Sequence, residues 1–152
     1  MPSQATTEAT DVAAFAAALD DFVRAARRAR GRLANEADLS LSQYHLLEPL
    51  LSVEEPGLGV GELACAAGVS APTATRMLAG LERAGLVERR ACARDRRVVR
   101  VALTPDGAGR MARKRERIRG RREELYRSLE PEERAQAARL LERLAAAIED
   151  LR

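Results

Sequence analysis

Residues 70–104 read SAPTATRMLAGLERAGLVERRACARDRRVVRVALT, and this stretch decides the fold. Its first half predicts a helix over residues 71–84, capped by Ser70, with Pro72 in the first turn, where no intrahelical N–H bond is lost. Gly85 is expected to end the helix, because glycine readily adopts the left-handed conformation found after helices. The three- and four-residue spacing predicts a buried stripe of Ala74, Met77, Leu78 and Leu81.

The second half predicts a β-hairpin. Residues 86–90 and 98–103 are strand-like, and residues 91–97 form the turn between them. Upstream, a short helix over residues 60–67 ends at Gly68 and is followed directly by the cap of the next helix, which is the spacing of a helix-turn-helix. With the basic hairpin added, the outline is that of a winged helix-turn-helix. In this arrangement the second helix enters the major groove of DNA, and the hairpin arginines reach phosphates or the adjacent minor groove.

Further helices flank this lobe. The apolar spacing predicts helices over residues 11–34, from Ser40, from Thr104 to about residue 129, and from Pro131 onward. The expected order is therefore α-α-α-α-β-β-α-α, a mainly α protein with a small β-hairpin wing. The terminal helices exceed what a small DNA-binding module needs, and their apolar stripes predict a partner.

The basic charge of the chain is concentrated in one segment. The net charge is only +3, whereas residues 76–100 contain eight arginines and three acidic residues and so carry +5. This distribution favours a polyanionic partner. Hydrophobic residues make up 46% of the sequence but aromatic residues only 3%, so the core must consist mostly of alanine, leucine and valine.

Other function classes find little support in the sequence. Cys65 and Cys92 form neither a metal-ligand spacing nor a disulfide framework, and a single histidine cannot build a zinc site. There is no nucleophile–base constellation and no phosphate-binding loop, so we expect no enzyme, no catalytic residue, no metal and no cofactor. No signal peptide or transmembrane run is visible, and we expect a cytoplasmic protein with no membrane partner.

Several motifs resemble the MarR (multiple antibiotic resistance regulator) family of bacterial transcription regulators. They are Gly61–Ala64 (GELA), Gly68–Ser70 (GVS), Leu81–Val87 (LERAGLV) and residues 95–104 (DRRVVRVALT), with Gly107 in place. The last segment looks like the family's wing motif, D-x-R followed by a strand and L-T-x-x-G. The helix order is also similar over nearly the whole chain, from about Val12 to Leu151.

The resemblance implies an obligate homodimer whose N- and C-terminal helices intertwine, with one winged helix in each subunit. We expect a disordered tail at residues 1–10, a dimerisation helix at 11–38, a DNA-binding lobe at 39–104 and C-terminal dimerisation helices at 105–152. The expected partner is double-stranded DNA with a pseudo-palindromic operator. Because family members often bind small aromatic or amphipathic effectors, we also expect a repressor that an effector releases.

The predicted recognition helix supplies one set of expected DNA contacts. Thr73, Thr75 and Arg76 lie opposite the apolar stripe; Arg76 suits guanine N7 and O6, and a threonine suits a base edge or a thymine methyl. The residues better placed for phosphate or sugar contacts are Ser70, Pro72 and Arg83. The alternative is an ordinary solvated helix face, with Thr73 merely supporting the first turn.

The predicted wing supplies a second set. Arg94 and Arg96 are expected at its tip, in the minor groove or against phosphates, together with the neighbouring Arg97. Asp95 would be repelled by DNA, and we expect it to hold the shape of the turn by accepting hydrogen bonds from turn amides or by pairing with Arg97. On composition alone, a solvated charged turn is the alternative.

Two regulatory hypotheses follow. Candidates to line an effector pocket are Phe15, Phe22, Tyr44 and His45, although core packing is the commoner fate of such residues. The alternative is redox sensing through Cys92 or Cys65, since an exposed thiol near arginines gains thiolate character.

A different class of function is a winged-helix adaptor that binds proteins and has no DNA target. The basic turn at residues 94–97 favours DNA binding, because an adaptor need not carry it. Retention on DNA at two salt concentrations separates the two classes.

Overall fold

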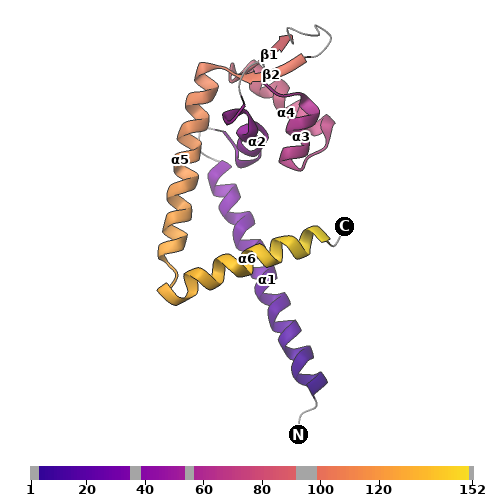
Figure 1. Ribbon diagram of the computed structural model, residues 1–152, viewed down its shortest axis with the longest axis vertical. Helices are drawn as coiled ribbons and strands as arrows, with labels where there is room; N and C mark the ends of the chain where they lie inside the picture. Colours follow the sequence, from indigo (N-terminus) through magenta and orange to yellow (C-terminus); the bar gives the residue numbers. More distant parts are fainter. Residues whose placement is uncertain (1–3, 35–38, 54–56, 92–98, 151–152) are drawn as a thin grey trace. The chain divides into compact units, whose positions relative to one another are not determined.

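The computed structural model describes residues 4–34, 39–53, 57–91 and 99–150. The chain divides into two compact units, Met1–Met111 and Ala112–Arg152. Within the described residues, helices precede and follow a single β-hairpin (Figure 1). The predicted fold class, a mainly α winged helix-turn-helix with added terminal helices, is confirmed.

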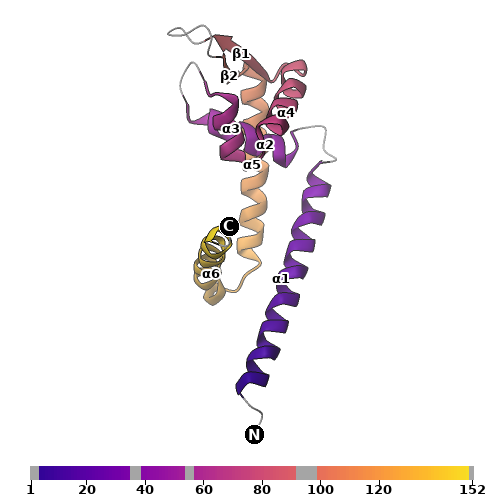
Figure 2. The same ribbon diagram turned by 90° about the vertical axis from the view of Figure 1, so that its right-hand side faces the viewer.

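The N-terminal helix α1 (Gln4–Ala34) runs without interruption (Figure 2). It begins before Asp11, the predicted start, so residues 4–10 are helical and are not part of the expected disordered tail. Residues 4–10, QATTEAT, contain neither glycine nor proline, so nothing in them interrupts a helix. Its large apolar side chains remain exposed in the single chain, namely Val12, Phe15, Leu19, Phe22 and Val23.

Helix α2 (Leu41–Leu47) begins at the predicted place, after a capping box formed by Ser40 and Gln43. The Gln43 amide donates to Ser40 Oγ at 3.2 Å, and the Ser40 amide donates to Gln43 Oε1 at 2.8 Å. The chain then tightens into the 3-10 helix η1 (Glu48–Leu51) and does not continue as an α-helix. Pro49 lies at this change. It lacks the N–H that an α-helical hydrogen bond requires, and so it favours the end of the α-helix here.

Helices α3 (Val60–Ala67) and α4 (Ala71–Arg83) form the predicted helix-turn-helix. Gly68 ends α3 in the left-handed conformation, with φ of 64°. Ser70 Oγ then accepts from the Thr73 amide at 3.4 Å and caps α4. On the inner face of α4, the fully buried residues are Ala74, Leu78 and Leu81, whereas Met77 is half-buried.

The wing consists of two antiparallel strands, β1 (Val87–Ala91) and β2 (Val99–Leu103). A third, one-residue strand was not predicted: Leu58 forms a bridge with Val101 through backbone hydrogen bonds of 3.1 and 2.7 Å. Gly57 makes this approach possible, because it has φ of 98° and a Cβ there would lie 2.1 Å from the Val101 carbonyl oxygen. The hairpin is therefore joined to the loop that leads into α3.

The buried core of the first unit is built mainly from leucine, alanine and valine, as the composition predicted. Its members are Leu39, Tyr44, Leu46, Leu47, Leu50, Leu63, Ala64, Ala74, Leu78, Leu81, Leu86, Val87, Val101 and Met111. They come from α2, η1, α3, α4, both strands and the start of α5, with Leu39 and Leu86 in the connecting segments. The core thus holds the helix-turn-helix and the hairpin together as one lobe.

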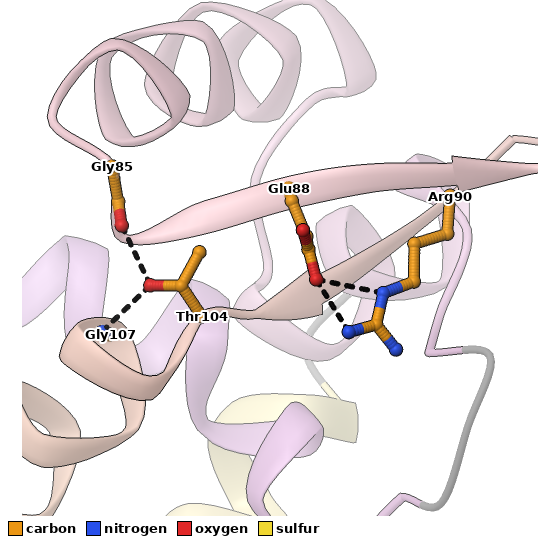
Figure 3. Close-up of polar contacts among 5 residues, drawn as sticks. All are labelled: Gly85, Glu88, Arg90, Thr104 and Gly107. Atoms are coloured by element: carbon orange, nitrogen blue, oxygen red, sulfur yellow. Dashed lines mark hydrogen bonds and ion pairs between the residues drawn. The ribbon is translucent and has the colours of Figure 1, made fainter.

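The L-T-x-x-G motif fixes the start of helix α5 (Pro105–Arg127). Thr104 Oγ1 donates to the Gly85 carbonyl at 2.6 Å and accepts from the Gly107 amide at 3.0 Å (Figure 3). A Cβ at Gly107 would lie 1.9 Å from the carbonyl oxygen of Leu86. One hydroxyl therefore caps α5 and ties it to the turn that follows α4, and only glycine fits at position 107 beside the Leu86 carbonyl.

The second unit contains the rest of α5 and helix α6 (Pro131–Asp150). Its basic residues form i,i+3 and i,i+4 ion pairs such as Arg119–Glu116 and Arg127–Glu123, which are typical of a solvated helix flank. Lys114 differs from these exposed arginines, because its side chain is fully buried. The apolar residues of α6 stay exposed, namely Leu140, Leu141 and Ile148.

Candidate DNA-binding surface

The outward face of α4 carries an arginine whose charge is free to meet a partner. Arg76 is exposed, and its guanidinium makes no ion pair or hydrogen bond with the described residues. It lies on the second turn of a helix whose first turn is capped by Ser70 and contains Pro72, both exposed. A free guanidinium near a helix N-terminus is suited to bidentate recognition of a guanine edge.

The two threonines of α4 are partly engaged within the helix. Thr73 Oγ1 lies 2.9 Å from Ser70 Oγ, so Thr73 supports the first turn. Thr75 Oγ1 donates to the Ala71 carbonyl at 2.9 Å. The hydroxyl proton of Thr75 is thereby committed, and its methyl group and oxygen lone pairs remain for a partner.

Arg83 lies at the C-terminal end of the exposed face of α4. Its Nε donates to the Ala79 carbonyl at 3.3 Å, which orients the side chain along the helix. The two Nη groups keep their donors for an external anion. Its location at the C-terminal end of α4 suits a phosphate contact and not a base contact.

The arginines at the root of the wing are not free. Arg89 Nε pairs with Glu82 of α4 at 3.1 Å. The other two such arginines pair as Arg90–Glu88 and Arg100–Glu62, each at 2.5 Å (Figure 3 shows the first pair). Glu82 and Glu88 are already counted in the local charge of +5, whereas Glu62 lies outside residues 76–100, so its pairing with Arg100 lowers that charge by one. No local sequence pattern indicates the Arg100–Glu62 pair, because its members are 38 residues apart in the chain.

The expected wing-tip residues lie outside the described part of the chain. They are Arg94, Asp95, Arg96 and Arg97, together with Cys92. The strands that lead to them are described, and they end at Ala91 and begin again at Val99. The roles of the wing-tip residues stay predictions.

The four candidate pocket residues do not share one pocket in the described chain. His45 lines a cavity of about 780 Å³ with Ser42, Pro49 and Ala67 among its other walls. Tyr44 is buried, packs edge-to-face against His45 at 5.5 Å, and donates its hydroxyl to Glu48 at 3.2 Å. Phe15 and Phe22 lie exposed on α1.

Cys65 is an exposed free thiol on α3. No group of three or more His, Cys, Asp or Glu side chains in the described ranges is placed to hold a metal ion. Among the helices that the structure describes, none has the length and apolar character needed to cross a membrane.

The fold and this surface define a winged helix-turn-helix protein. Residues 39–99, which span α2, the helix-turn-helix and the beginning of β2, match the family model of the MarR family. This lobe of the chain thus matches the MarR family, which confirms the resemblance seen in the sequence. Among curated proteins, none matches the chain.

Solved structures agree on the fold. A crystal structure of a MarR family transcription regulator is 23% identical, with a TM-score of 0.80, and the match covers 98% of this chain and 97% of that one. FabT of Streptococcus pneumoniae, solved in complex with DNA, is 23% identical with a TM-score of 0.71, over 94% of this chain and 99% of that one. MepR of S. aureus, also solved with DNA, is 23% identical with a TM-score of 0.71, over 84% and 94% of the two chains.

Proposed function

We propose that this protein is a sequence-specific DNA-binding transcription regulator that acts as a homodimer and represses its target. The observation that carries the proposal is the exposed, unpaired Arg76 on the outer face of α4, within a lobe of MarR type. The similar proteins FabT and MepR, both solved with DNA, support it. On this proposal α4 enters the major groove and the wing meets the flanking backbone or minor groove.

The contacts divide by what they recognise. Arg76 reads guanine, and the methyl group of Thr75 meets a thymine methyl. Backbone contacts, which position the protein without reading sequence, come from Ser70, Pro72 and Arg83. In the wing, the proposed phosphate or minor-groove contacts are Arg94, Arg96 and Arg97, with Asp95 shaping the turn.

Exposed apolar side chains on the terminal helices support the homodimer. Val12, Phe15 and Phe22 of α1 are 62%, 52% and 60% exposed, and Leu140, Leu141 and Ile148 of α6 are 52%, 57% and 61% exposed. Monomeric soluble proteins rarely leave such stripes in water, whereas dimer interfaces bury them. A second copy of the chain presents the same stripes, and a two-fold dimer places its recognition helices on half-sites about 10 bp apart.

We further propose that a small aromatic or amphipathic effector releases the repressor. It acts by binding more tightly to a dimer whose recognition helices no longer match successive major grooves. The cavity beside His45 has the volume of a typical small-molecule pocket, which spans roughly 300–1,000 Å³. A panel of small aromatic acids and amines, scored by release of bound duplex, tests this part of the proposal; no release by any member at saturation rejects it.

DNA binding itself is tested by Arg76→Ala with Arg119→Ala as the matched control. Both variants remove one exposed arginine, but Arg119 lies on the solvated flank of α5 and pairs with Glu116. We expect Arg76→Ala to weaken binding to a selected duplex by about 1–3 kcal/mol and to relax preference at one position of the site. Arg119→Ala should bind as the wild type does. Equal affinities for both variants and the wild type would reject the assigned role of α4.

A further inference from the structure

Two arginines face each other across the wing hairpin. In the antiparallel register Arg90 is the direct partner of Arg100, so the two side chains project from the same face of the two strands. Like charges placed directly opposite each other destabilise a strand pair. The hairpin therefore needs a carboxylate near each of these guanidinium groups.

The two carboxylates come from different places. Glu88 neutralises Arg90 from within strand β1, at 2.8 Å from Nε to Oε1. Glu62 neutralises Arg100 from helix α3, at 2.5 Å between Nη1 and Oε2. The first pair is internal to the wing, whereas the second joins the wing to the helix-turn-helix.

Glu62 also shapes the start of α3. The oxygen that accepts from Arg100 accepts from the Gly59 amide at 2.7 Å, in the capping-box position of the helix. One carboxylate oxygen thus fixes strand β2 to the first turn of α3. The backbone bridge between Leu58 and Val101 holds the same two segments beside each other, and the ion pair adds a side-chain link next to it.

The surroundings of Arg100 leave little water to replace its ion pair with Glu62. Its side chain is 29% exposed, and its Nε is buried without a hydrogen-bond partner in the described chain. A partly desolvated guanidinium has fewer waters to replace a lost carboxylate. Arg100 consequently depends on Glu62 more than an exposed arginine on a helix flank depends on its partner.

We propose that Glu62 and Arg100 are positioning residues for DNA binding, whose ion pair sets the orientation of the wing hairpin relative to the helix-turn-helix. The proposal rests on the proposed DNA-binding function, since it concerns how α4 and the wing meet one duplex together. Neither residue touches DNA in this account. They act through the hairpin strands β1 and β2, whose placement against α3 sets how the wing meets the duplex.

The direction in which Glu62→Gln changes the DNA affinity distinguishes a positioning role from an effect of net charge alone. Glu62→Gln keeps a side-chain oxygen for the Gly59 amide, because glutamine also serves in a capping box, but it removes the charge that pairs with Arg100. Removing a negative charge from a DNA-binding lobe should tighten binding if only net charge matters. If the ion pair positions the wing, the same substitution weakens binding.

The experiment measures the affinity of full-length wild type, Glu62→Gln, Arg100→Gln and the double variant for a mixed-sequence duplex of about 40 bp, long enough for two half-sites. We expect each single variant to bind about 5- to 30-fold more weakly and the double variant to be no weaker than the worse single, as for two residues that act as a unit. Melting temperatures should change by no more than about 3 °C, because partly exposed ion pairs contribute little stability.

Glu88→Gln is the matched control. It removes the same charge from the wing root but leaves the link to α3 in place, so its affinity should equal or exceed that of the wild type. A loss of DNA affinity for Glu88→Gln as large as that for Glu62→Gln overturns the proposal. Binding would then depend on neutralising the hairpin arginines and not on the link between the hairpin and α3.

The salt dependence of binding separates positioning from direct contact. Losing one phosphate contact lowers the slope of log affinity against log salt by about 0.9, whereas a change in wing orientation leaves that slope nearly unchanged. A reduced slope for Arg100→Gln together with tighter binding by Glu62→Gln would overturn the proposal and make Arg100 a phosphate ligand. Failure of the wild type itself to bind the duplex at low salt would instead reject the proposed function.

Discussion

Gly107 is the position at which a single added methyl group should disturb the lobe most clearly. A Cβ there would lie 1.9 Å from the Leu86 carbonyl oxygen, and such contacts are essentially never closer than 3.0 Å, so the start of α5 or the carbonyl must move by about 1 Å. That movement strains the two hydrogen bonds of Thr104, to the Gly85 carbonyl and from the Gly107 amide. Each is worth about 1 kcal/mol.

The expected net effect is a loss of about 1–4 kcal/mol. Overpacking contributes about 1–3 kcal/mol and the weakened hydrogen bonds about 1–2 kcal/mol, while the better helix propensity of alanine returns about 1 kcal/mol. For a chain of this length the melting temperature of Gly107→Ala should fall by about 2–16 °C. Calorimetry or circular dichroism measures it, at one fixed protein concentration because the proposed dimerisation would add to the stability.

Gly120→Ala provides the control within the same helix. Nothing lies within 4 Å of a Cβ at Gly120, so the substitution should only improve helix propensity and raise the melting temperature by about 2–4 °C. If Gly107→Ala is as stable as the wild type or more stable, the packing of α5 against the Leu86 carbonyl is wrong.

Three further predictions concern the cap, the surface and the interface. Thr104→Ala should cost about 1–2 kcal/mol and Thr104→Ser much less, because serine keeps the hydroxyl that bridges Gly85 and Gly107; equal melting temperatures for the two variants would argue against the bridge. Arg76→Ala should weaken DNA binding by about 1–3 kcal/mol with unchanged melting temperature, as measured by fluorescence anisotropy. Phe22→Asp should shift the chain from dimer to monomer in sedimentation, since an exposed apolar stripe then receives a charge; an unchanged dimer would remove α1 from the interface.

Local chemistry made much of this fold predictable. Three helix boundaries are marked by local residues, and the structure confirms all three. They are the start of α2 at Ser40 with Gln43, the end of α3 at Gly68, and the start of α5 at Thr104 with Gly107. Such signals act over three or four residues, so one sequence is enough to read them.

Features that depend on distant residues were not predictable. The bridge of Leu58 to Val101 involves a single residue, which has no periodicity to reveal a strand. The partner of Arg100 lies 38 positions away, and the burial of Lys114 in an arginine-rich run contradicts its composition. Tertiary packing determines all three features, and the local sequence pattern does not indicate them.

The candidate surface was only partly predictable for the same reason. Helical spacing located the exposed face of α4, including Arg76, correctly. It did not reveal that Thr75 commits its hydroxyl to the Ala71 carbonyl or that Arg89 is neutralised by Glu82. Fewer arginines are therefore free for a partner than the eight that the segment contains.

Selection of bound sequences from a random duplex library tests the central claim most directly. The account predicts recovery of an inverted repeat whose half-sites are centred about 10 bp apart, with one guanine position that loses its preference when Arg76 is replaced by alanine. Recovery of no enriched sequence at low salt, or of a site without two-fold symmetry, would contradict the claim that two copies of this lobe read one duplex.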